Sequence, residues 1–554
     1  MDPTSTLLHL LIIAALGLEA SRSQGAEPSG DELPAGGTSD DGFCDRNLEA
    51  LTAGPAETLT PPRLRGLWVS TGCEIRPGPE FVTRRYQFIN DTHFSALQFY
   101  YSDSSCRDAF YGLETRGYLK VEGNSLSPGL LGWKSSAYEL FRPPMLLQVT
   151  AMPYTESAAK FLQSKVTSFS AECRRRFQSN PLESDWSPGG GPYHLLLYVE
   201  YRGRVMRDFD CSRKLGFNLH EMQLVRTELG AERRRRLYLG DLATDFSQRH
   251  RHRPSSFQEP LEEATAQDCS NCQLLSRASL RQPPALPWRA LMTLSGSPLG
   301  EWISVRCESR PQSNYLIRRL RFLPASNSSA SSNRWVGEYH HFHDPLCGRP
   351  YFSVTAYGWV TAKSRDSLLP ATRQFEFRIV GLAITPRDSR SLDQLTAYDG
   401  FGCGRRSDWR LNQAQDVTST NGCDHFRLQV PTTSEQVMME ELLSGGRALL
   451  WVGAIPNSLP GGGGGIDNHG VPERHLPTSF QSPLIRCREF ETRASFASSA
   501  SSASAVPHRP PSASSKEDAR SEGRSSGGSP LAQRRHRVIC WVLAAAMALN
   551  SPWY

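Results

Sequence analysis

The side chains best suited to chemistry in this sequence are histidines and cysteines that lie close together. In the run 340–344, HHFHD, His341 and His343 would share one face of a strand and could bind a metal ion. Cys269 and Cys272 have the spacing of half a zinc site, although no second Cys-x-x-Cys pair accompanies them. The sequence contains no HExxH motif, no G-x-S-x-G motif and no P-loop. The histidine run is therefore the main candidate for metal chemistry. Whether its side chains bind a metal or pack in the core depends on the fold around them.

The chain contains two copies of one domain. Residues 68–88 match residues 302–322 without a gap, and both share Trp, Ser, Cys, Glu, Arg, Pro, Arg, Arg and Phe in the same order. The similarity resumes after a short insertion, and residues 254–261 near the end of the first copy match residues 477–484 of the second. The distance between the copies is the size of a domain and exceeds that of a solenoid repeat.

The duplication favours packing over metal binding for the histidine run. Where the second copy has HHFHD at 340–344, the first copy has FYYSD at 99–103. Aromatic packing explains both copies, whereas a metal site would exist in one copy alone. We therefore expect no metal, no cofactor and no enzymatic activity. A secreted hydrolase or metal enzyme built on His340–His343 remains the least favoured alternative.

Two Arg-Arg pairs, at 84–85 and 318–319, raise a question of burial. Neighbouring residues on a strand point to opposite faces, so one arginine of each pair should point inward. A buried arginine needs a carboxylate or carbonyl partner. Glu74 and Glu308 occur at the same spacing in the two copies, and we expect each to pair with the inward arginine of its copy. A structural ion pair is favoured over a ligand site.

The sequence predicts a mainly β protein. Strand-like alternation recurs throughout both copies, and one face of residues 81–88 would carry Val82, Arg84, Tyr86 and Phe88. Helical periodicity is scarce, and the best candidates for helices are residues 156–169 and 434–443. We expect two duplicated antiparallel β-barrel-like domains side by side, braced by disulfides and with few short helices.

Composition and length fit an extracellular protein of two domains. The chain has 554 residues, and its formal net charge of +6 is too small for this length to indicate a nucleic-acid partner. The predicted parts are a signal peptide (1–23), a first β domain (43–275), a linker (276–298), a second β domain (299–487), a disordered Ser-rich stalk (488–533) and a membrane-anchor segment (534–554).

Both ends of the chain point to the cell surface. The apolar run 7–18 is too short to span a bilayer and suits the core of a signal peptide. Near the other end, a basic cluster at 534–537 precedes the short apolar run 538–549. A cleaved GPI signal and a short type I span both remain open for this tail. Either anchor would hold the protein on the extracellular face of the cell membrane.

The cysteines fit a disulfide framework. Of 13 cysteines, Cys540 lies in the tail, and the other 12 are an even number in a chain with a signal peptide. A bond inside one copy should recur in the other, so we expect Cys73–Cys106 to correspond to Cys307–Cys347 and Cys173–Cys211 to correspond to Cys403–Cys423. The pairing of the remaining four stays open: Cys44, Cys269, Cys272 and Cys487.

The two N-x-S/T sequons, Asn90 and Asn327, occupy the same place in the two copies. Each follows the strand that carries the Arg-Arg pair and precedes the next aromatic strand. A hairpin tip tolerates a bulky sugar, so we expect glycosylation at both asparagines.

Several motifs resemble those of the adenomatosis polyposis coli down-regulated protein family. They are WVSTGCEIRPGPEF at 68–81, WISVRCESRP at 302–311, QFYY at 98–101, HEMQLVR at 220–226, LGD at 239–241, RPSSF at 253–257 and QDVTSTNGC at 415–423. The resemblance runs in order through residues 43–487. The short tail departs from the family pattern and leaves the type of anchor open. The glycine run at 461–465 and the Arg-rich runs also depart from it, and we place the chain nearer to the "-like" branch of the family.

The resemblance implies a cell-surface glycoprotein that inhibits Wnt signalling. Such a protein would engage Wnt ligands and the low-density-lipoprotein-receptor-related co-receptors. It also implies an apolar pocket for a lipid, with the Wnt fatty-acyl chain as the candidate. Aromatic positions that could line this pocket are Phe99, Tyr101, Tyr339 and Phe342, although ordinary core packing is favoured over a pocket for each of them. The alternative function is an extracellular adhesion or receptor module that acts through protein surfaces without a lipid.

Overall fold

The computed structural model describes residues 42–490 apart from several gaps, and these residues belong to one compact unit, Met1–Thr492. The gaps are residues 55, 60, 91–92, 120, 126–137, 142–144, 168–192, 196–199, 202–203, 206–218, 231–232, 246–247, 250–251, 267–268, 312–313, 326–331, 364–368, 399–401, 444–445 and 456–475. The predicted signal peptide, the anchor segment and nearly all of the predicted stalk therefore lie outside the described residues. Among the helices that are described, none combines the length and the apolarity needed to cross a bilayer.

The first part of the chain forms a 13-stranded antiparallel sheet, here called the first half. Its strands are β1 (Glu57–Leu59), β2 (Gly66–Val69), β3 (Glu74–Arg76), β4 (Glu80–Phe88), β5 (His93–Tyr101), β6 (Ala109–Tyr118), β7 (Val121–Ser125), β8 (Tyr138–Phe141), β9 (Met145–Pro153), β10 (Tyr193–Leu195), β13 (Leu224–Leu229), β14 (Arg235–Leu239) and β15 (Leu261–Glu263). Their order is β10-β9-β6-β5-β4-β2-β15-β14-β13-β8-β7, with β1 on β13 and β3 on β4. The short strands β11 (Glu200–Tyr201) and β12 (Arg204–Val205) pair separately.

The later part forms an 11-stranded antiparallel sheet, the second half. Its strands are β16 (Ala290–Met292), β17 (Gly300–Ser304), β18 (Glu308–Arg310), β19 (Asn314–Leu323), β20 (Ser332–Phe342), β21 (Pro350–Ala362), β22 (Arg373–Pro386), β23 (Gln415–Asp416), β26 (Thr432–Leu442), β27 (Ala448–Val452) and β28 (Leu484–Arg488). The strands β24 (Gly422–Cys423) and β25 (Leu428–Gln429) form a separate pair.

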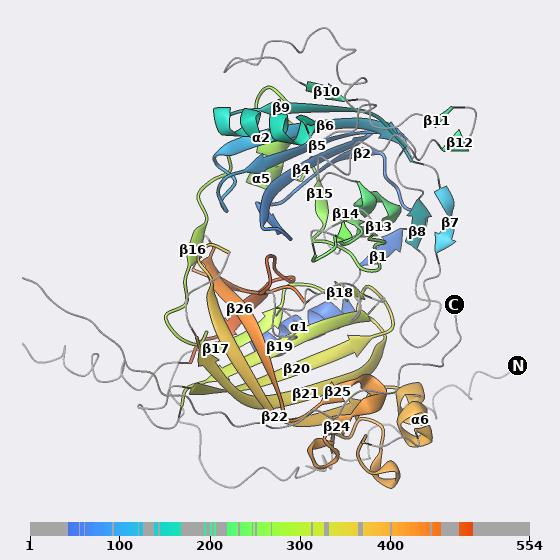
Figure 1. Ribbon diagram of the computed structural model, residues 1–554. Coiled ribbons are helices and arrows are strands. Elements are labelled where there is room, and N and C mark those ends of the chain that lie inside the picture. The colour runs from blue at the N-terminus through green and yellow to red at the C-terminus, as the bar shows by residue number, and fades with distance from the viewer. Residues whose placement is uncertain are drawn as a thin grey trace, which may run out of the picture. The chain divides into compact units, whose positions relative to one another are not determined.

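Helices are few among the described residues, and most of the structure in Figure 1 is strand. The α-helices are α1 (Phe43–Ala53), α2 (Glu156–Thr167), α5 (Ser270–Ser276) and α6 (Ser389–Ala397), and the 3-10 turns are η2 (His220–Gln223), η5 (Arg406–Asp408), η6 (Thr418–Thr420) and η7 (Asp424–Phe426). The prediction of a mainly β, disulfide-braced protein with two antiparallel sheets side by side is confirmed. The predicted residue bounds of the domains and the linker stay a prediction.

The two sheets differ in closure. In the second half, β22 pairs with β26, and the ring β17-β19-β20-β21-β22-β26-β27-β28 closes into a barrel of eight strands. In the first half, the corresponding edges turn elsewhere among the described residues: β9 pairs with β10, and β13 pairs with β8 and β1. The first half is therefore an opened version of the barrel that the second half completes.

One predicted helix is a strand. Residues 434–443 lie mostly in β26, whose neighbours are β22 and β27. The Glu, Met and Leu residues of this run favour helices in isolation, but barrel closure supplies ladder bonds on both sides of the strand and overrides that preference. The other predicted helix, 156–169, forms as α2, and the picture shows α2 lying across β9 and β6 (Figure 1).

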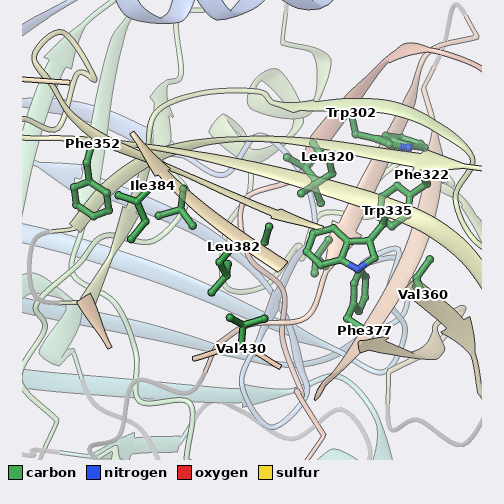
Figure 2. Packing of buried hydrophobic residues seen from close by; sticks show 14 of the residues in the cluster. Trp302, Leu320, Phe322, Trp335, Phe352, Val360, Phe377, Leu382, Ile384 and Val430 are labelled. Carbon is green, nitrogen blue, oxygen red and sulfur yellow. The ribbon is translucent and has the colours of Figure 1, made fainter. Parts of the chain in front are cut away.

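The core lies on the inner faces of the sheets. Along β4, Val82, Arg84, Tyr86 and Phe88 are all buried, as the alternation of the sequence predicted. In the second half, Trp302, Phe322, Trp335 and Phe377 lie close together inside the barrel (Figure 2), and edge-to-face contacts join Phe377 to Trp335 at 5.2 Å and to Phe322 at 6.2 Å. An eight-stranded barrel has an interior that such side chains can fill.

A helix covers the outer face of each half. Helix α5 packs on the first half, where Cys272 and Leu275 are fully buried. Helix α1 packs on the second half through Leu48 and Leu51, although it precedes the first half in sequence. From α1 onward, the described chain thus starts on the second half, crosses to build the first half, and then returns.

Candidate functional site

A buried ion pair is repeated in the two halves. Arg84 Nε donates to Glu74 Oε1 at 2.9 Å, and Arg318 Nε donates to Glu308 Oε1 at 2.7 Å. The hydroxyl of Ser70 donates to the same oxygen of Glu74 at 2.6 Å, and the corresponding hydroxyl of the second half does so at 2.7 Å. These are the pairs that the sequence predicted, and their full use of the carboxylate oxygens gives them a structural role.

The first half adds a second buried acid, Glu221, which η2 delivers to the interior. Glu221 Oε2 accepts from Arg76 Nη2 at 2.8 Å, and Oε1 accepts from Gln98 Nε2 at 3.2 Å and from the hydroxyl of Tyr86. Burial alone would raise the pKa of Glu221, but Arg76 and Arg84 outweigh it and hold the pKa below its usual value. The carboxylate is therefore ionised and belongs to a neutral network of two acids and two arginines.

A cavity of about 620 Å³ lies between the two halves, a volume typical of a small-molecule site. Corresponding residues of the duplicated sequence line it: Glu74 and Glu308, Arg76 and Arg310, Phe257 and Phe480, Gln258 and Gln481, and Glu259 and Ser482. We call this cavity the cleft. Because both copies contribute the same positions, the two halves present the same surface to each other.

Apolar side chains of the second half form one wall of the cleft. They include Leu443, Leu449, Trp451, Ile455 and Phe480. Ile455 is 53% exposed and Leu443 is 37% exposed, so the wall is open to an apolar ligand. Trp451 and Phe480 contact each other edge to face at 5.9 Å.

Polar contacts hold the halves together around the cleft. The hydroxyl of Ser482 donates to the carboxylate of Glu259, its counterpart in the first half. The backbone N–H of Phe257 donates to Ser309 Oγ at 3.3 Å, and that of Gly78 donates to Thr478 Oγ1 at 3.0 Å. The cleft is therefore bounded by contacts that are mainly polar, while its wall is apolar.

Two arginines bridge the halves in the same way. Arg289 binds both carboxylate oxygens of Glu441, at 2.8 and 2.6 Å, lies over the ring of Trp451, and donates to the carbonyl oxygen of Cys73 at 3.1 Å. It also reaches the carbonyl oxygen of Ser104 at 3.5 Å.

The partners of the second bridge correspond to those of the first, although Arg226 itself aligns with Met439 and not with Arg289. Arg226 lies 4.0 Å from the ring centre of Tyr238 and 3.5 Å from Glu228, and it donates to the carbonyl oxygen of Pro345 at 3.1 Å. Tyr238 corresponds to Trp451, Glu228 to Glu441, and Pro345 to Ser104. The repetition of this contact indicates that the halves face each other about an approximate two-fold axis.

The disulfides combine repeated and unrepeated bonds. Three of the four pairs that the repeat predicted are bonded in the structure: Cys73–Cys106, Cys307–Cys347 and Cys403–Cys423. The fourth, Cys173–Cys211, lies outside the described residues. The four cysteines left open form Cys44–Cys487, which ties α1 to β28 of the second half, and Cys269–Cys272.

The sequons are described in part. Asn90 is exposed in the hairpin between β4 and β5, where its side-chain oxygen accepts from the N–H of His93 at 2.7 Å. The exposed position can accept a sugar, and modification stays a prediction. Asn327 lies outside the described residues.

The four aromatic residues considered for a lipid pocket do not gather at one place. Phe99 and Tyr101 lie under α5 on the outer face of the first half. Phe342 lies in the cluster under α1, and Tyr339 packs against the interior cluster of the second half. None of the four lines the cleft. Three of them, Phe99, Tyr101 and Phe342, point outward on their strands, where a helix covers them.

The histidines make separate contacts. His341 Nδ1 lies 2.8 Å from Asn314 Oδ1 and its ring stacks on Phe352 at 4.4 Å, while His343 Nε2 lies 2.8 Å from Asp388 Oδ2. His340 Nδ1 lies 3.0 Å from Ser353 Oγ. Within the described part of the chain, no group of three or more His, Cys, Asp or Glu residues is arranged to hold a metal.

The sequence did not reveal the cleft or the arginine bridges. Arg289 lies in the predicted linker and Glu441 in the run taken for a helix, so neither stood out. The repeated segments 254–261 and 477–484 carried a partial signal, since they supply corresponding residues to the cleft. Which faces of the two halves meet is a long-range property that the repeat alone does not contain.

The family comparison agrees with this duplicated architecture. The model of the family described as "Adenomatosis polyposis coli down-regulated 1" matches residues 44–287 and 290–439, one segment in each half. The two segments cover most of the described strands, and they include the repeated ion pairs and the first part of the cleft lining. The chain therefore belongs to the adenomatosis polyposis coli down-regulated 1 family.

Proposed function

We propose that this protein is a cell-surface negative regulator of Wnt signalling that binds the fatty-acyl chain of a Wnt ligand in the cleft between its halves. The observation that carries the proposal is the cleft itself, with a volume of about 620 Å³ and a wall lined by apolar side chains. Membership of the family points to the Wnt pathway. The cleft points to a lipid, because a site of this size with an apolar wall suits an acyl chain.

The energetics favour an acyl chain over a purely polar ligand. Burial contributes about 0.8 kcal/mol per methylene, so a 16-carbon chain could supply on the order of 10 kcal/mol before ordering costs. The aromatic rings of Trp451 and Phe480 offer large apolar area at low entropic cost. Polar contacts at the rim would remain in place while the chain fills the interior.

The rest of the proposal concerns location and partners. A signal peptide at 1–23 and a tail at 534–554, attached as a GPI anchor or a single type I span, would tether the protein to the outer surface of the cell. Low-density-lipoprotein-receptor-related co-receptors are proposed as second partners. The function needs no cofactor and no catalytic step, so we propose that the protein is not an enzyme.

The direct test compares a Wnt ligand that carries its acyl chain with the same ligand lacking the acylated serine. The full-length protein on cells should bind the acylated form strongly and the other form weakly. Ile455→Arg places a charge on the cleft wall and should remove that preference. Ile89→Arg is the matched control, because Ile89 is 65% exposed at the β4–β5 hairpin, away from the cleft lining, and should bind as the unaltered protein does.

Equal binding of the two Wnt forms would remove the lipid mechanism. It would favour the adhesion or receptor module that acts through protein surfaces. Loss of binding in both variants would point to a folding defect, which a thermal unfolding measurement on each variant detects. In that case Leu449→Gln, a milder change in the same wall, decides the question by the same comparison.

A further inference from the structure

The interiors of the two halves differ in buried charge. In the first half, Arg76 and Arg84 have two carboxylates, Glu74 and Glu221, within 3.5 Å of their guanidinium nitrogens. The corresponding residues of the second half are Arg310 and Arg318. The structure places one carboxylate, Glu308, beside both of them, at 2.8 and 2.7 Å. The second network therefore carries one positive charge more than the first.

The missing acid has no substitute among its former neighbours. Two of the residues that hydrogen-bond Glu221 in the first half, Tyr86 and Gln98, are replaced in the second half by Leu320 and Tyr339. The other two, Arg76 and Gln258, are kept there as Arg310 and Gln481. Where the first half has η2 with Glu221, the second half has the regular strand β26, so the acid is lost while the arginine and the glutamine that bind it remain.

An excess buried cation is costly unless an anion accompanies it. Glu308 is 2% exposed and Arg318 is 3% exposed, so solvent screens neither of them well. Burial lowers the pKa of Arg310, with Glu308 opposing this shift and Arg318 adding to it. Arg310 makes its remaining polar contact with the side-chain oxygen of Gln481, a neutral group. Among the side chains that the structure describes, no further carboxylate therefore balances the charge of Arg310 and Arg318 as Glu221 does in the first half.

The site is reached from the cleft. Glu308, Ser309 and Arg310 belong to the cleft lining, as do Trp451 and Phe480 of the apolar wall. A ligand with an acyl chain along this wall would carry its polar end toward Arg310.

We propose that Arg310, assisted by Arg318, binds a single anionic group, a carboxylate or a phosphate, at the head of an amphiphile whose chain lies in the cleft. This inference rests on the proposed acyl-binding cleft and concerns a free amphiphile with an anionic head, because the serine ester of an acylated Wnt ligand is uncharged. The anion supplies the charge that Glu221 supplies in the first half, and charge-assisted hydrogen bonds to a guanidinium give the preference its strength.

The experiment measures the affinity of the purified full-length protein for three probes of equal chain length: palmitate, hexadecyl phosphate and hexadecanol. Palmitate and hexadecyl phosphate should bind about tenfold more tightly than hexadecanol. Tighter binding of palmitate than of hexadecyl phosphate would indicate a fatty-acid head, and the reverse order would indicate a phospholipid-like head. Inorganic phosphate alone should bind weakly, because it lacks the chain.

The variants separate the head group from the chain. Arg310→Gln should bind hexadecanol as the unaltered protein does and should lose the preference for the two anionic probes. Arg334→Gln is the matched control, since Arg334 is exposed on β20 and lies outside the cleft lining. It removes the same charge and should keep the preference. Should Arg310→Gln not fold, Arg310→Lys keeps the charge but loses the two-pronged geometry and should retain part of the preference.

The outcomes distinguish the two proposals. Binding of all three probes with equal affinity overturns the anionic head but leaves the acyl-binding function. Failure of all three probes to bind overturns the proposed function. An undiminished preference in Arg310→Gln contradicts the role of Arg310.

Discussion

The two halves share one sequence pattern but differ in how the sheet closes and in how buried charges are balanced. The second half closes its barrel by pairing β22 with β26 and fills it with aromatic rings. The first half leaves that seam open among the described residues and inserts η2, whose Glu221 completes a neutral network of charges. The strands and the repeated Arg–Glu pair are common to both copies. The strand pairing that closes the barrel and the balance of buried charge differ between them.

This comparison separates what the fold requires from what is free to serve a ligand. The pairs Arg84–Glu74 and Arg318–Glu308 occur in both halves and fix the short strands β3 and β18 against their neighbours. The fourth charge occurs in one half alone. A feature found in both copies is best explained by the fold, and a feature found in one copy is open to a role in binding.

The largest expected effect breaks the charge balance of the first half. Arg84→Gln leaves Glu74 and Glu221 buried with one arginine between them and should cost about 3–5 kcal/mol of unfolding free energy. Arg310→Gln removes the excess charge of the second half and should cost less than about 1 kcal/mol, because Glu308 keeps Arg318 as its partner. Urea unfolding of both variants measures the difference. Equal losses of unfolding free energy in the two variants would contradict the proposed difference in charge balance between the two networks.

A second prediction concerns how each half holds its covering helix. Replacing Cys44 and Cys487 by serine frees α1 from the second half and opens a loop with a sequence separation of 443 residues, so the loss should be about 2–5 kcal/mol. The same change at Cys269 and Cys272 opens a separation of three residues and should cost less. Thermal unfolding under non-reducing conditions compares the two double variants. A larger loss of stability from the Cys269–Cys272 change would contradict the proposed importance of the disulfide that holds α1 on the second half.

These disulfides also show where sequence reasoning succeeds. Cys73–Cys106 and Cys307–Cys347 were predictable because each bond joins two loops inside one copy, so the repeat constrains it. Cys44–Cys487 joins the beginning of the described chain to its end. It forms because α1 packs on the second half although the first half follows it directly in sequence. That packing is a property of the assembled fold.

The ion pairs and the cleft give the same lesson. Glu74 and Arg84 are close in sequence, and strand alternation alone brings them to one face. Arg289 and Glu441 meet because the linker and β26 lie beside the turn that carries Cys73. Local periodicity contains no information about that meeting, and it also mistook β26 for a helix. The fold class was therefore predictable, and the candidate site was not.

The smallest expected effect concerns pH. His341 stacks on Phe352 where the first half stacks Tyr100 on Tyr111. Burial lowers the pKa of His341 from 6.5 to about 3, with Arg310 and His340 adding to the shift. The unfolded chain takes up a proton near pH 6.5 and the folded chain does not, so this contribution to stability is complete above pH 6.5 and declines as the pH falls.

His341→Tyr gives the second half the residue of the first and should flatten the fall in stability between pH 7 and pH 5. Denaturant unfolding at several pH values measures the slope. An unchanged slope would mean that another group accounts for it, and the correspondence between the two aromatic pairs would then be one of shape alone.

The account depends most on the cleft as the place where an acyl chain binds. Photo-crosslinking tests this directly, with a palmitate analogue that carries a diazirine in its chain and the full-length protein, followed by mass spectrometry of the labelled peptides. The account predicts labels in residues 449–455 and 480–485, which supply the apolar wall and its continuation in the cleft lining. Labels confined to other parts of the chain, or no saturable labelling at all, would contradict it.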